Sequence, residues 1–296
     1  MKQKKSGLLR RTTAADVLIF AFFVMISFSM LIPFWNTLVT SLSPESENME
    51  PTFRLFPNTI SFDGYKGILS QDKLIRSFFI NVFITITGTF LHVLLTCMAG
   101  YALSQGRFRG KQTIMNLVLI SMVLPGQVMM IPLFILYRDL NLLDNILVMV
   151  VSVMVSAYSI LLFRNFFLSI PKAVHEAAVM DGAGEFKILF RIYLPMSKAG
   201  IATVTLFQMV ARWNTFFEGV LYINSSSKQP LQVVLNEIVA TFANNNPSAS
   251  AAVGGSMLGK NIQSASVILS MLPLLIIYPI LQRYFIRGIF LGSVKE

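Results

Sequence analysis

The sequence predicts an all-α membrane protein with six transmembrane helices and both termini in the cytoplasm. Hydrophobic residues make up 54% of its 296 residues and charged residues only 13%, whereas soluble domains carry about 25% charged residues. The mean hydropathy is +0.66. Six apolar segments are each long enough to cross the hydrocarbon layer of a membrane, which takes roughly 20 residues of helix.

The predicted spans follow one another closely along the chain. They cover residues 16–41, 77–103, 113–137, 145–168, 196–222 and 264–287. The first span follows a basic N-terminus, as the apolar part of a signal peptide does. It is longer than that part, however, and no small-residue cleavage site follows it. We therefore expect it to be retained, and we expect residues 1–296 to form one domain, because no connection is long enough for a soluble domain.

Lysine and arginine residues predict the orientation. Sixteen of them lie at or near the N-terminus, the second and fourth connections and the C-terminus, against seven in the other three connections. The richer side is the cytoplasmic one. The net charge of +10 then follows from membrane orientation, and no nucleic-acid partner is needed. The long fifth connection, residues 223–263, lies on the outer side.

Two local patterns argue against metal and nucleotide sites on this chain. The single cysteine, Cys97, excludes an intramolecular disulfide and a cysteine-rich metal site, and it lies in an apolar run. Residues 254–261, GGSMLGKN, resemble a phosphate-binding loop. They lack the final Ser or Thr that binds magnesium, and no strand precedes them.

The fourth connection, residues 169–195, is too polar to cross a membrane. It reads SIPKAVHEAAVMDGAGEFKILFRIYLP. The pattern predicts a short helix that begins at Pro171, with one face formed by Val174, Ala177, Ala178 and Asp181. Gly182 and Gly184 then bend the chain, and a second amphipathic turn follows. These residues alone leave two interpretations open: a slim lever that docks on a partner, or a connector that rests on the membrane.

The spacing of this segment resembles a known signature. Glu176-Ala177-Ala178, Gly182, Ile192 and Leu194-Pro195 match the EAA motif of ABC-importer permeases at every position. The segments YALSQGRFRGK, ARWNTFF and YPILQRYFIRGIFLGSVKE resemble the carbohydrate permeases of the maltose-transporter (MalG-like) type, and the similarity extends over residues 16–296. The segment IPFWNTLVTSLS resembles a branch that handles complex or uronate-containing oligosaccharides.

The resemblance implies a type I ABC-importer permease fold and a transport subunit of a bacterial cell membrane rather than an enzyme. The chain would form half of the path for an oligosaccharide. It would dock on a cytoplasmic ATPase through the EAA segment, whose implied coupling residues are the motif residues and Asp181: Glu176, Ala177, Ala178, Asp181, Gly182, Ile192, Leu194 and Pro195. The implied partners are a second homologous permease, two copies of the ATPase, which would bind ATP and magnesium, and a solute-binding protein that residues 223–263 would approach.

Polar side chains inside the spans mark candidates for the sugar path, because such side chains usually face protein or water. In the second span they form a stripe: Asn81, Thr85, Thr89, His92 and Thr96. This stripe is either a hydrogen-bonding contact between helices or the wall of a cavity for sugar hydroxyls. His92 stands alone, which favours a packed histidine over a metal ligand or a proton relay.

The fifth span carries a charge well inside the membrane. Its polar residues lie on two faces, one with Gln208, Arg212 and Thr215 and the other with Asn214 and Glu218. An unpaired arginine in a span costs roughly 2.5–3.5 kcal/mol. Arg212 therefore predicts either a carboxylate on a neighbouring helix or a water-filled path, and in such a path it would favour an acidic sugar.

Three further residues are weaker candidates. Trp213 and Tyr222 are of the type that stacks on sugar rings, and equally of the type that packs or anchors at an interface. Gln127 follows Pro125 in a kinked third span, and kinked segments are tolerated where they line a cavity.

Three alternatives remain: an ABC importer of another solute, a secondary transporter and a membrane enzyme. A secondary transporter would show inverted repeats and carboxylates inside its spans, and here Glu218 lies near the outer end of its span. An enzyme would show a catalytic pairing or a metal cluster, and the sequence shows neither.

Overall fold

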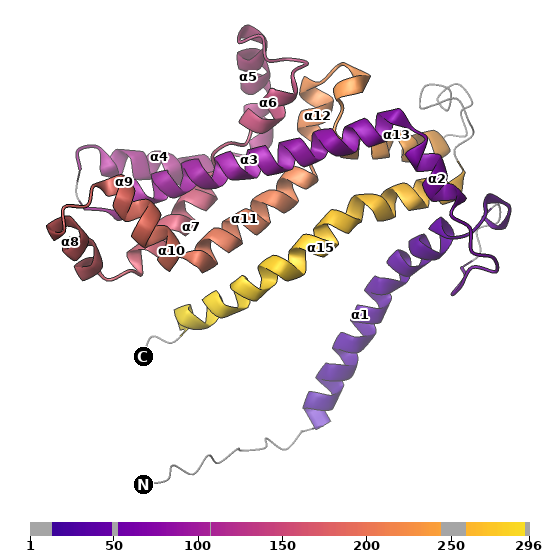
Figure 1. The fold of residues 1–296 in the computed structure, drawn as a ribbon, viewed down its shortest axis with the longest axis horizontal. Coiled ribbons are helices and arrows are strands. Elements are labelled where there is room, and N and C mark those ends of the chain that lie inside the picture. Colours follow the sequence, from indigo (N-terminus) through magenta and orange to yellow (C-terminus); the bar gives the residue numbers. More distant parts are fainter. Residues whose placement is uncertain (1–13, 49–52, 107, 244–258, 294–296) are drawn as a thin grey trace. The chain divides into compact units, whose positions relative to one another are not determined.

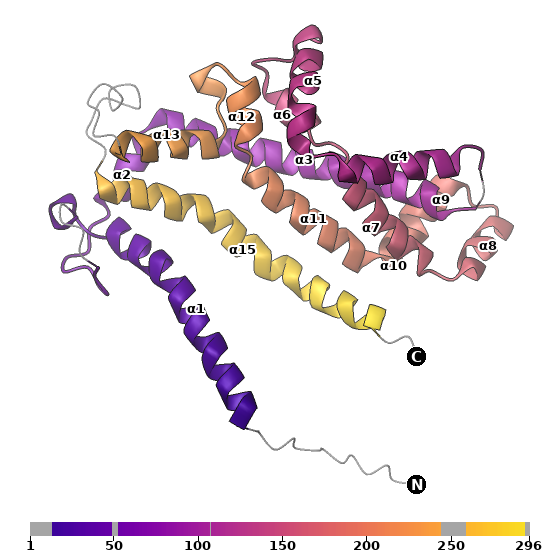
Figure 2. The ribbon, with the colours of Figure 1, turned by 180° about the vertical axis from the view of Figure 1, so that it is seen from behind.

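The computed structural model describes residues 14–48, 53–106, 108–243 and 259–293. In these residues every regular element is a helix (Figure 1 and Figure 2). The chain divides into two compact units, residues 1–67 with 258–268 and residues 68–257 with 269–296, and each is described by itself. The basic N-terminus, Arg107 and residues 254–258 of the GGSMLGKN segment lie outside the described residues.

The first unit contains α1 (Ala14–Ser41), the turn η1 (Glu45–Glu47), most of α2 (Asp63–Leu69) and the first turns of α15 (Lys260–Ser293). No residue in the most apolar 18-residue stretch of α1 is buried by the described part of the chain, as expected of a helix that faces lipid or another subunit. After α1, the Glu47 carboxylate accepts hydrogen bonds from the Thr59 hydroxyl and from the amides of Asn58 and Thr59. These bonds hold the pKa of Glu47 below its usual value.

The second unit is built around α3 (Asp72–Ser104). Four helices pack along α3: α6 (Ile146–Val151), α7 (Ala157–Leu168), α11 (Lys198–Trp213) and α13 (Leu231–Ala243) (Figure 1). α12 (Phe217–Tyr222) and the turn η3 (Ser226–Lys228) connect α11 with α13. α3 is therefore the helix against which the other predicted spans of this unit are arranged.

α3 and α7 approach each other closely at Gly100. A Cβ atom at this position would lie 2.7 Å from Cβ of Phe163 and 2.9 Å from the carbonyl oxygen of Ile160. Phe163 and Phe167 of α7 are buried beside it, with ring centroids 5.8 Å apart. The absence of a side chain at Gly100 lets the two backbones pack directly, as small residues do between membrane helices.

Replacing Gly100 with alanine is expected to destabilise the protein by about 1–3 kcal/mol. The added methyl group would meet backbone atoms of α7, which cannot turn aside as a side chain can. The thermal-unfolding midpoint of the detergent-solubilised protein is the measurement. Gly106→Ala is the matched control, because a Cβ atom there meets nothing within 4 Å. Equal midpoints for the two variants would contradict the close packing.

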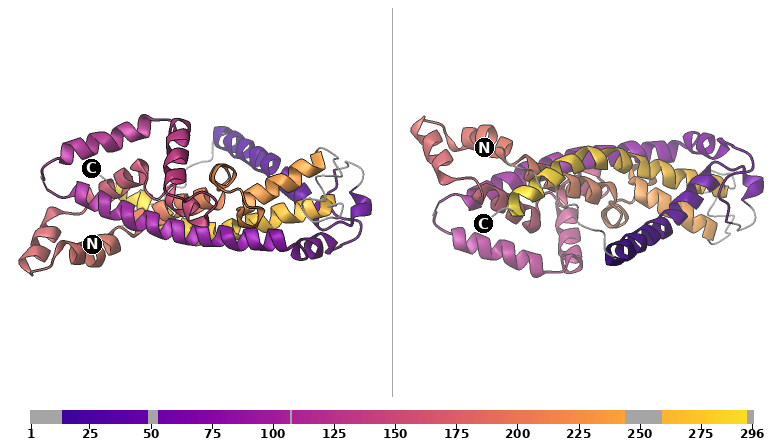
Figure 3. Two further views of the ribbon diagram at one scale, coloured as in Figure 1. Left: turned by 90° about the horizontal axis from the view of Figure 1, so that it is seen from above. Right: turned by 90° about the horizontal axis from the view of Figure 1, so that it is seen from below.

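Among the described residues, three helices are long and apolar enough to cross a membrane: α1, α3 and residues Lys260–Ile280 of α15. They correspond to the predicted spans 16–41, 77–103 and 264–287. α4 (Lys111–Val123) and α5 (Gly126–Asp139) would together make a fourth, but they meet at 107°, and Figure 3 shows the sharp turn between them. The number of six spans stays a prediction.

The other three predicted spans are not single helices. Residues 113–137 break at Leu124-Pro125, where proline supplies no amide for a helical bond. Residues 145–168 break at 152–156, where β-branched valines disfavour the helix and the Ser156 hydroxyl accepts the Ser159 amide at 3.2 Å to begin α7. Residues 196–222 break at 214–216, between α11 and α12.

The third and fifth connections meet at Asp144. Its carboxylate accepts hydrogen bonds from the Ser225 hydroxyl at 2.5 Å, from the amides of Asn224 and Ser225, and from Lys228 Nζ at 3.0 Å. These bonds hold the pKa of Asp144 well below its usual value, and the hydrogen bond from the Ser225 hydroxyl makes the largest contribution. The contact requires the two connections to lie on the same side of the membrane.

Candidate substrate path and coupling segment

The break between α6 and α7 is held by side chains of α3 and α11. His92 is buried, with Nδ1 3.1 Å from the carbonyl oxygen of Val153 and Nε2 2.8 Å from Ser159 Oγ. A carbonyl oxygen only accepts, so Nδ1 carries the proton and Nε2 accepts from the Ser159 hydroxyl. Gln208 Nε2 reaches the same Val153 carbonyl at 3.5 Å. Backbone that leaves the helix inside a membrane needs such partners.

Arg212 donates hydrogen bonds to backbone carbonyl groups at the C-terminal end of α6. Its side chain is 2% exposed, and its guanidinium donates to the carbonyl oxygens of Met149 and of Val150, the latter at 3.0 Å. Carbonyls in the last turn of a helix have no partner within the helix and carry partial negative charge. Gly88 makes room for the guanidinium, because a Cβ atom there would lie 3.0 Å from Nε of Arg212.

The sequence predicts a carboxylate or a water-filled path for Arg212, and the hydrogen-bond acceptors that the structure gives it are of another kind. The partners are backbone carbonyls of a broken span. They supply partial negative charge to the two terminal nitrogens of the guanidinium, while the buried Nε has no hydrogen-bond partner among the described residues. These contacts favour a structural role for Arg212.

The second break, after α11, is also stabilised by a side chain of α3. The carbonyl oxygen of Trp213 accepts from Asn81 Nδ2 at 3.0 Å and from Gln232 Nε2 at 3.4 Å. The Trp213 indole donates to the Ser270 carbonyl at 2.8 Å and packs edge-on against Phe78, with ring centroids 5.8 Å apart. Trp213 is thus a buried packing residue and has no free face for a sugar ring.

The polar stripe on α3 is a contact surface between helices. Asn81 and His92 hold the two breaks, and the Thr96 hydroxyl donates to the His92 carbonyl at 2.5 Å. Thr85 and Thr89 are buried on the same face, and their hydroxyls have no hydrogen-bond partner among the described residues. Of the two interpretations of the stripe, the contact between helices fits the structure.

Gln127 and Glu218 line one cavity of about 380 Å³. Its walls come from α5, from the break at 152–153 and from α12, and they include Ser152 and Tyr222. Tyr222 is buried against Tyr137, with ring centroids 5.1 Å apart, so it forms the wall rather than a stacking platform. Asn214 is exposed outside this lining and bonds to the Val210 carbonyl of its own helix at 2.9 Å.

The predicted coupling segment, residues 169–195, is a bent pair of helices (Figure 1). α8 (Lys172–Met180) begins one residue after Pro171. α9 (Glu185–Ile188), the π-helical η2 (Leu189–Tyr193) and α10 (Leu194–Met196) lead into α11. Gly182 at the bend has φ +74°, a left-handed conformation that glycine adopts without strain. A Cβ atom on it would meet nothing within 4 Å.

The motif residues divide between the surface and the core. Five are exposed: Glu176, Ala177, Asp181, Gly182 and Pro195. Ala178 is 6% exposed and packs, together with Val174, against the chain's own core, as do Ile192 and Leu194. The sequence predicts Ala178 on the docking face with Ala177, and the structure differs because α8 needs one apolar side to attach to the helices beside it.

An aromatic cluster joins α8 to the predicted spans. The Tyr193 ring of η2 meets Tyr101 of α3 at 5.0 Å, Phe167 of α7 at 5.7 Å and His175 of α8 at 6.2 Å between centroids, all edge-on. The Tyr101 hydroxyl donates to Glu185 of α9 at 2.5 Å. Sequence reasoning missed Tyr101, His175 and Glu185, because they lie in separate segments and share no spacing pattern.

Residues 92–291 match the sequence pattern of the family described as binding-protein-dependent transport system inner membrane component. The chain belongs to this family. The permease is 34% identical over 281 residues to the polygalacturonan/rhamnogalacturonan transport system permease protein YtcP of Bacillus subtilis (strain 168), covering 95% of the permease and 98% of that relative. It is 31% identical over 277 residues to the arabinooligosaccharides transport system permease protein AraQ of the same bacterium, covering 93% and 94%.

A solved structure also resembles the permease. It belongs to a bacterial ABC transporter involved in the import of the acidic polysaccharide alginate. The TM-score is 0.84 at 29% sequence identity, and the match covers 93% of the permease and 98% of that chain. The resemblance to ABC-importer permeases is thereby confirmed. The relatives are transport permeases, which are not enzymes.

Proposed function

We propose that this permease forms half of the sugar path of an ATP-driven importer, and that α8 docks on a cytoplasmic ATPase. The observation that carries the proposal is the exposed edge of α8 and its bend, with Glu176, Ala177, Asp181 and Gly182. Glu176 also borders a polar cavity of about 550 Å³ together with Lys172 and His175. The segment continues into α11 through short helices, so a force applied to α8 would reach a predicted span.

The proposed cargo is an oligosaccharide that contains uronate residues. The names of the polygalacturonan/rhamnogalacturonan relative and of the alginate importer support it. Arg212 would not select the acid, because backbone carbonyls occupy its guanidinium. The cavity of Gln127 and Glu218 offers an amide and a carboxylate, which suit sugar hydroxyls and would repel a carboxylate. Selection for the acid would then lie with the solute-binding protein or the second permease.

In the proposed assembly six spans cross the membrane, three of them as broken helices, and both termini lie in the cytoplasm. Residues 223–263 would face the solute-binding protein. A second, homologous permease would complete the path. Two copies of the ATPase would bind ATP and magnesium.

Purification of the tagged permease from its native membrane tests the assembly. We expect an ATPase and a second permease to co-purify, and we expect ATP-dependent uptake of oligogalacturonides in proteoliposomes that also contain the solute-binding protein. An active homodimer without an ATPase would contradict the proposal and favour a secondary transporter.

Substitutions in the cavity test the path. Glu218→Gln and Gln127→Leu are each expected to slow uptake by roughly threefold to tenfold, because each change weakens or removes a hydrogen bond to the sugar worth about 1 kcal/mol. Asn214→Ala is the control, since Asn214 lies outside the cavity lining. The rates are measured at equal amounts of assembled transporter. Unchanged uptake in both cavity variants would exclude this cavity from the path.

A further inference from the structure

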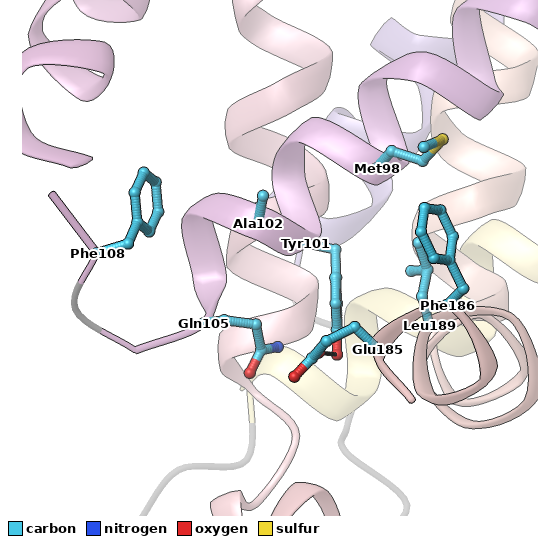
Figure 4. Close-up of a pocket in the computed structure, with 8 residues that line it drawn as sticks. All are labelled: Met98, Tyr101, Ala102, Gln105, Phe108, Glu185, Phe186 and Leu189. Atoms are coloured by element: carbon cyan, nitrogen blue, oxygen red, sulfur yellow. Dashed lines mark hydrogen bonds between the residues drawn. The ribbon is translucent and has the colours of Figure 1, made fainter. Parts of the chain in front are cut away.

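One polar bond joins the bend of the coupling segment to α3. Tyr101 is 6% exposed, and its hydroxyl donates to Glu185 Oε2 at 2.5 Å (Figure 4). Glu185 is the first residue of α9 and directly follows Gly184, so the bond ties the corner between α8 and α9 to the end of α3. A buried hydroxyl without a partner is unfavourable, and the Glu185 carboxylate, on a side chain that is 62% exposed, supplies that partner.

The same carboxylate also lies beside α8. Its second oxygen, Oε1, is 3.8 Å from His175 Nε2. This distance is too long for a hydrogen bond and suits an ion pair when the imidazole is protonated. The His175 ring in turn packs edge-on against Tyr193 of η2. Glu185 therefore stands between α8 and α3, with one oxygen toward each.

Apolar packing and a cavity both accompany this bond. Ile188 and Leu189 of the coupling segment pack with Tyr101 in one core cluster. Tyr101 and Glu185 line an apolar cavity of about 560 Å³ between α3 and α9 (Figure 4). Phe108 and Phe186 lie at its edge, and Phe186 remains 69% exposed, so neither ring fills the space. A movement of α9 therefore reaches α3 through this core packing and through the Tyr101–Glu185 bond, which is the polar and directional contact of the two.

We propose that Glu185 is the positioning residue that transmits a displacement of α8 to α3. This inference rests on the proposed docking of α8 on an ATPase. When the ATPase moves α8, the bend carries the Glu185 carboxylate, and Tyr101 transfers the movement to α3. α3 bears Asn81 and His92, which hold the two helix breaks, so the displacement reaches the part of the protein that borders the Gln127 cavity.

The complete transporter, reconstituted in proteoliposomes with its solute-binding protein, provides the test. The measurement is sugar imported per ATP hydrolysed. Tyr101→Phe keeps the ring and removes the donor, Glu185→Ala removes the acceptor, and Glu185→Gln keeps an acceptor oxygen. We expect the first two to lower the ratio by roughly threefold to tenfold each, the double variant to be no worse than either single one, and Glu185→Gln to keep most of the wild-type ratio.

Several outcomes would overturn the inference. A wild-type ratio in Tyr101→Phe is one, and fold-losses that multiply in the double variant are another, because two residues that act through one bond cannot lose it twice. Loss of ATPase co-purification in the variants would assign Glu185 to docking instead. If the wild-type permease itself brings down no ATPase, the proposed function fails. If the wild type is coupled and every variant is equally coupled, the inference alone fails.

Discussion

Arg212→Met is expected to destabilise the permease by about 2–4 kcal/mol. The substitution removes the side-chain donor of the Val150 carbonyl and leaves the Met149 carbonyl with only the Ser152 hydroxyl at 3.4 Å, and each unsatisfied buried group costs about 1–3 kcal/mol. The methionine side chain occupies much of the same volume, so the loss reports the hydrogen bonds more than a cavity. The midpoint of thermal unfolding in detergent and the yield of monodisperse protein are the measurements.

Two further variants provide comparisons for the stability of Arg212→Met. Arg138→Met removes an arginine whose side chain is 59% exposed and which pairs with Asp139 at 3.0 Å, and an exposed pair contributes little. Gly88→Ala keeps Arg212 but adds a methyl group 3.0 Å from its Nε, so an intermediate loss is expected. If Arg212→Met were as stable as Arg138→Met, the support of α6 by Arg212 would be contradicted.

The same residue separates a structural role from a role in cargo recognition. A structural role of Arg212 at α6 predicts that Arg212→Gln lowers the uptake of charged and neutral oligosaccharides by the same factor. A loss confined to the charged cargo would instead assign the guanidinium to the path.

Gly182→Leu is expected to uncouple ATP hydrolysis from uptake while the permease remains in the membrane. Gly182 has φ +74°, and an L-residue in this conformation costs roughly 1–2 kcal/mol, too little to unfold the protein. A Cβ atom there meets nothing within 4 Å among the described residues, so the added side chain is expected to project into the proposed docking surface. A bulky group at the centre of such a contact costs about 2 kcal/mol or more, and sugar imported per ATP should fall roughly tenfold.

Gly184→Leu is the matched control for this variant. Gly184 is also exposed and open around its Cβ position, but its φ of −74° suits any residue. Full coupling in Gly184→Leu with loss in Gly182→Leu supports docking at the bend. Full coupling in Gly182→Leu would rule out the bend as part of the ATPase contact.

The broken spans explain why the candidates for the sugar path fell into two groups. One group donates hydrogen bonds to backbone carbonyls within a helix break or in the last turn before one. The breaks are at 152–156 and 214–216, and the donors are Asn81, His92, Gln208 and Arg212. Gln127 and Glu218 instead border a cavity. A polar residue in a span either binds backbone groups at a break or lines a cavity, and helical spacing alone does not distinguish these two roles.

Helical spacing was sufficient to put the α3 stripe on one face, and all five of its residues are buried. Helical spacing could not indicate which groups these residues bind. The carbonyl that binds His92 lies 61 positions further along the chain, and the one that binds Asn81 lies 132 positions further. The same holds for Ala178, whose burial depends on the core beside α8 and not on the motif around it.

Composition and local spacing determined the helical membrane class, the predicted orientation and the EAA segment, because hydrophobicity, charge and helical period belong to neighbouring residues. Packing of the helices determined which residues satisfy the breaks in three predicted spans, and that Tyr101 meets Glu185. The acceptors of Asn81, His92 and Arg212 are backbone carbonyls. Every residue has such a group, so no sequence pattern can indicate which of them a distant side chain will bind.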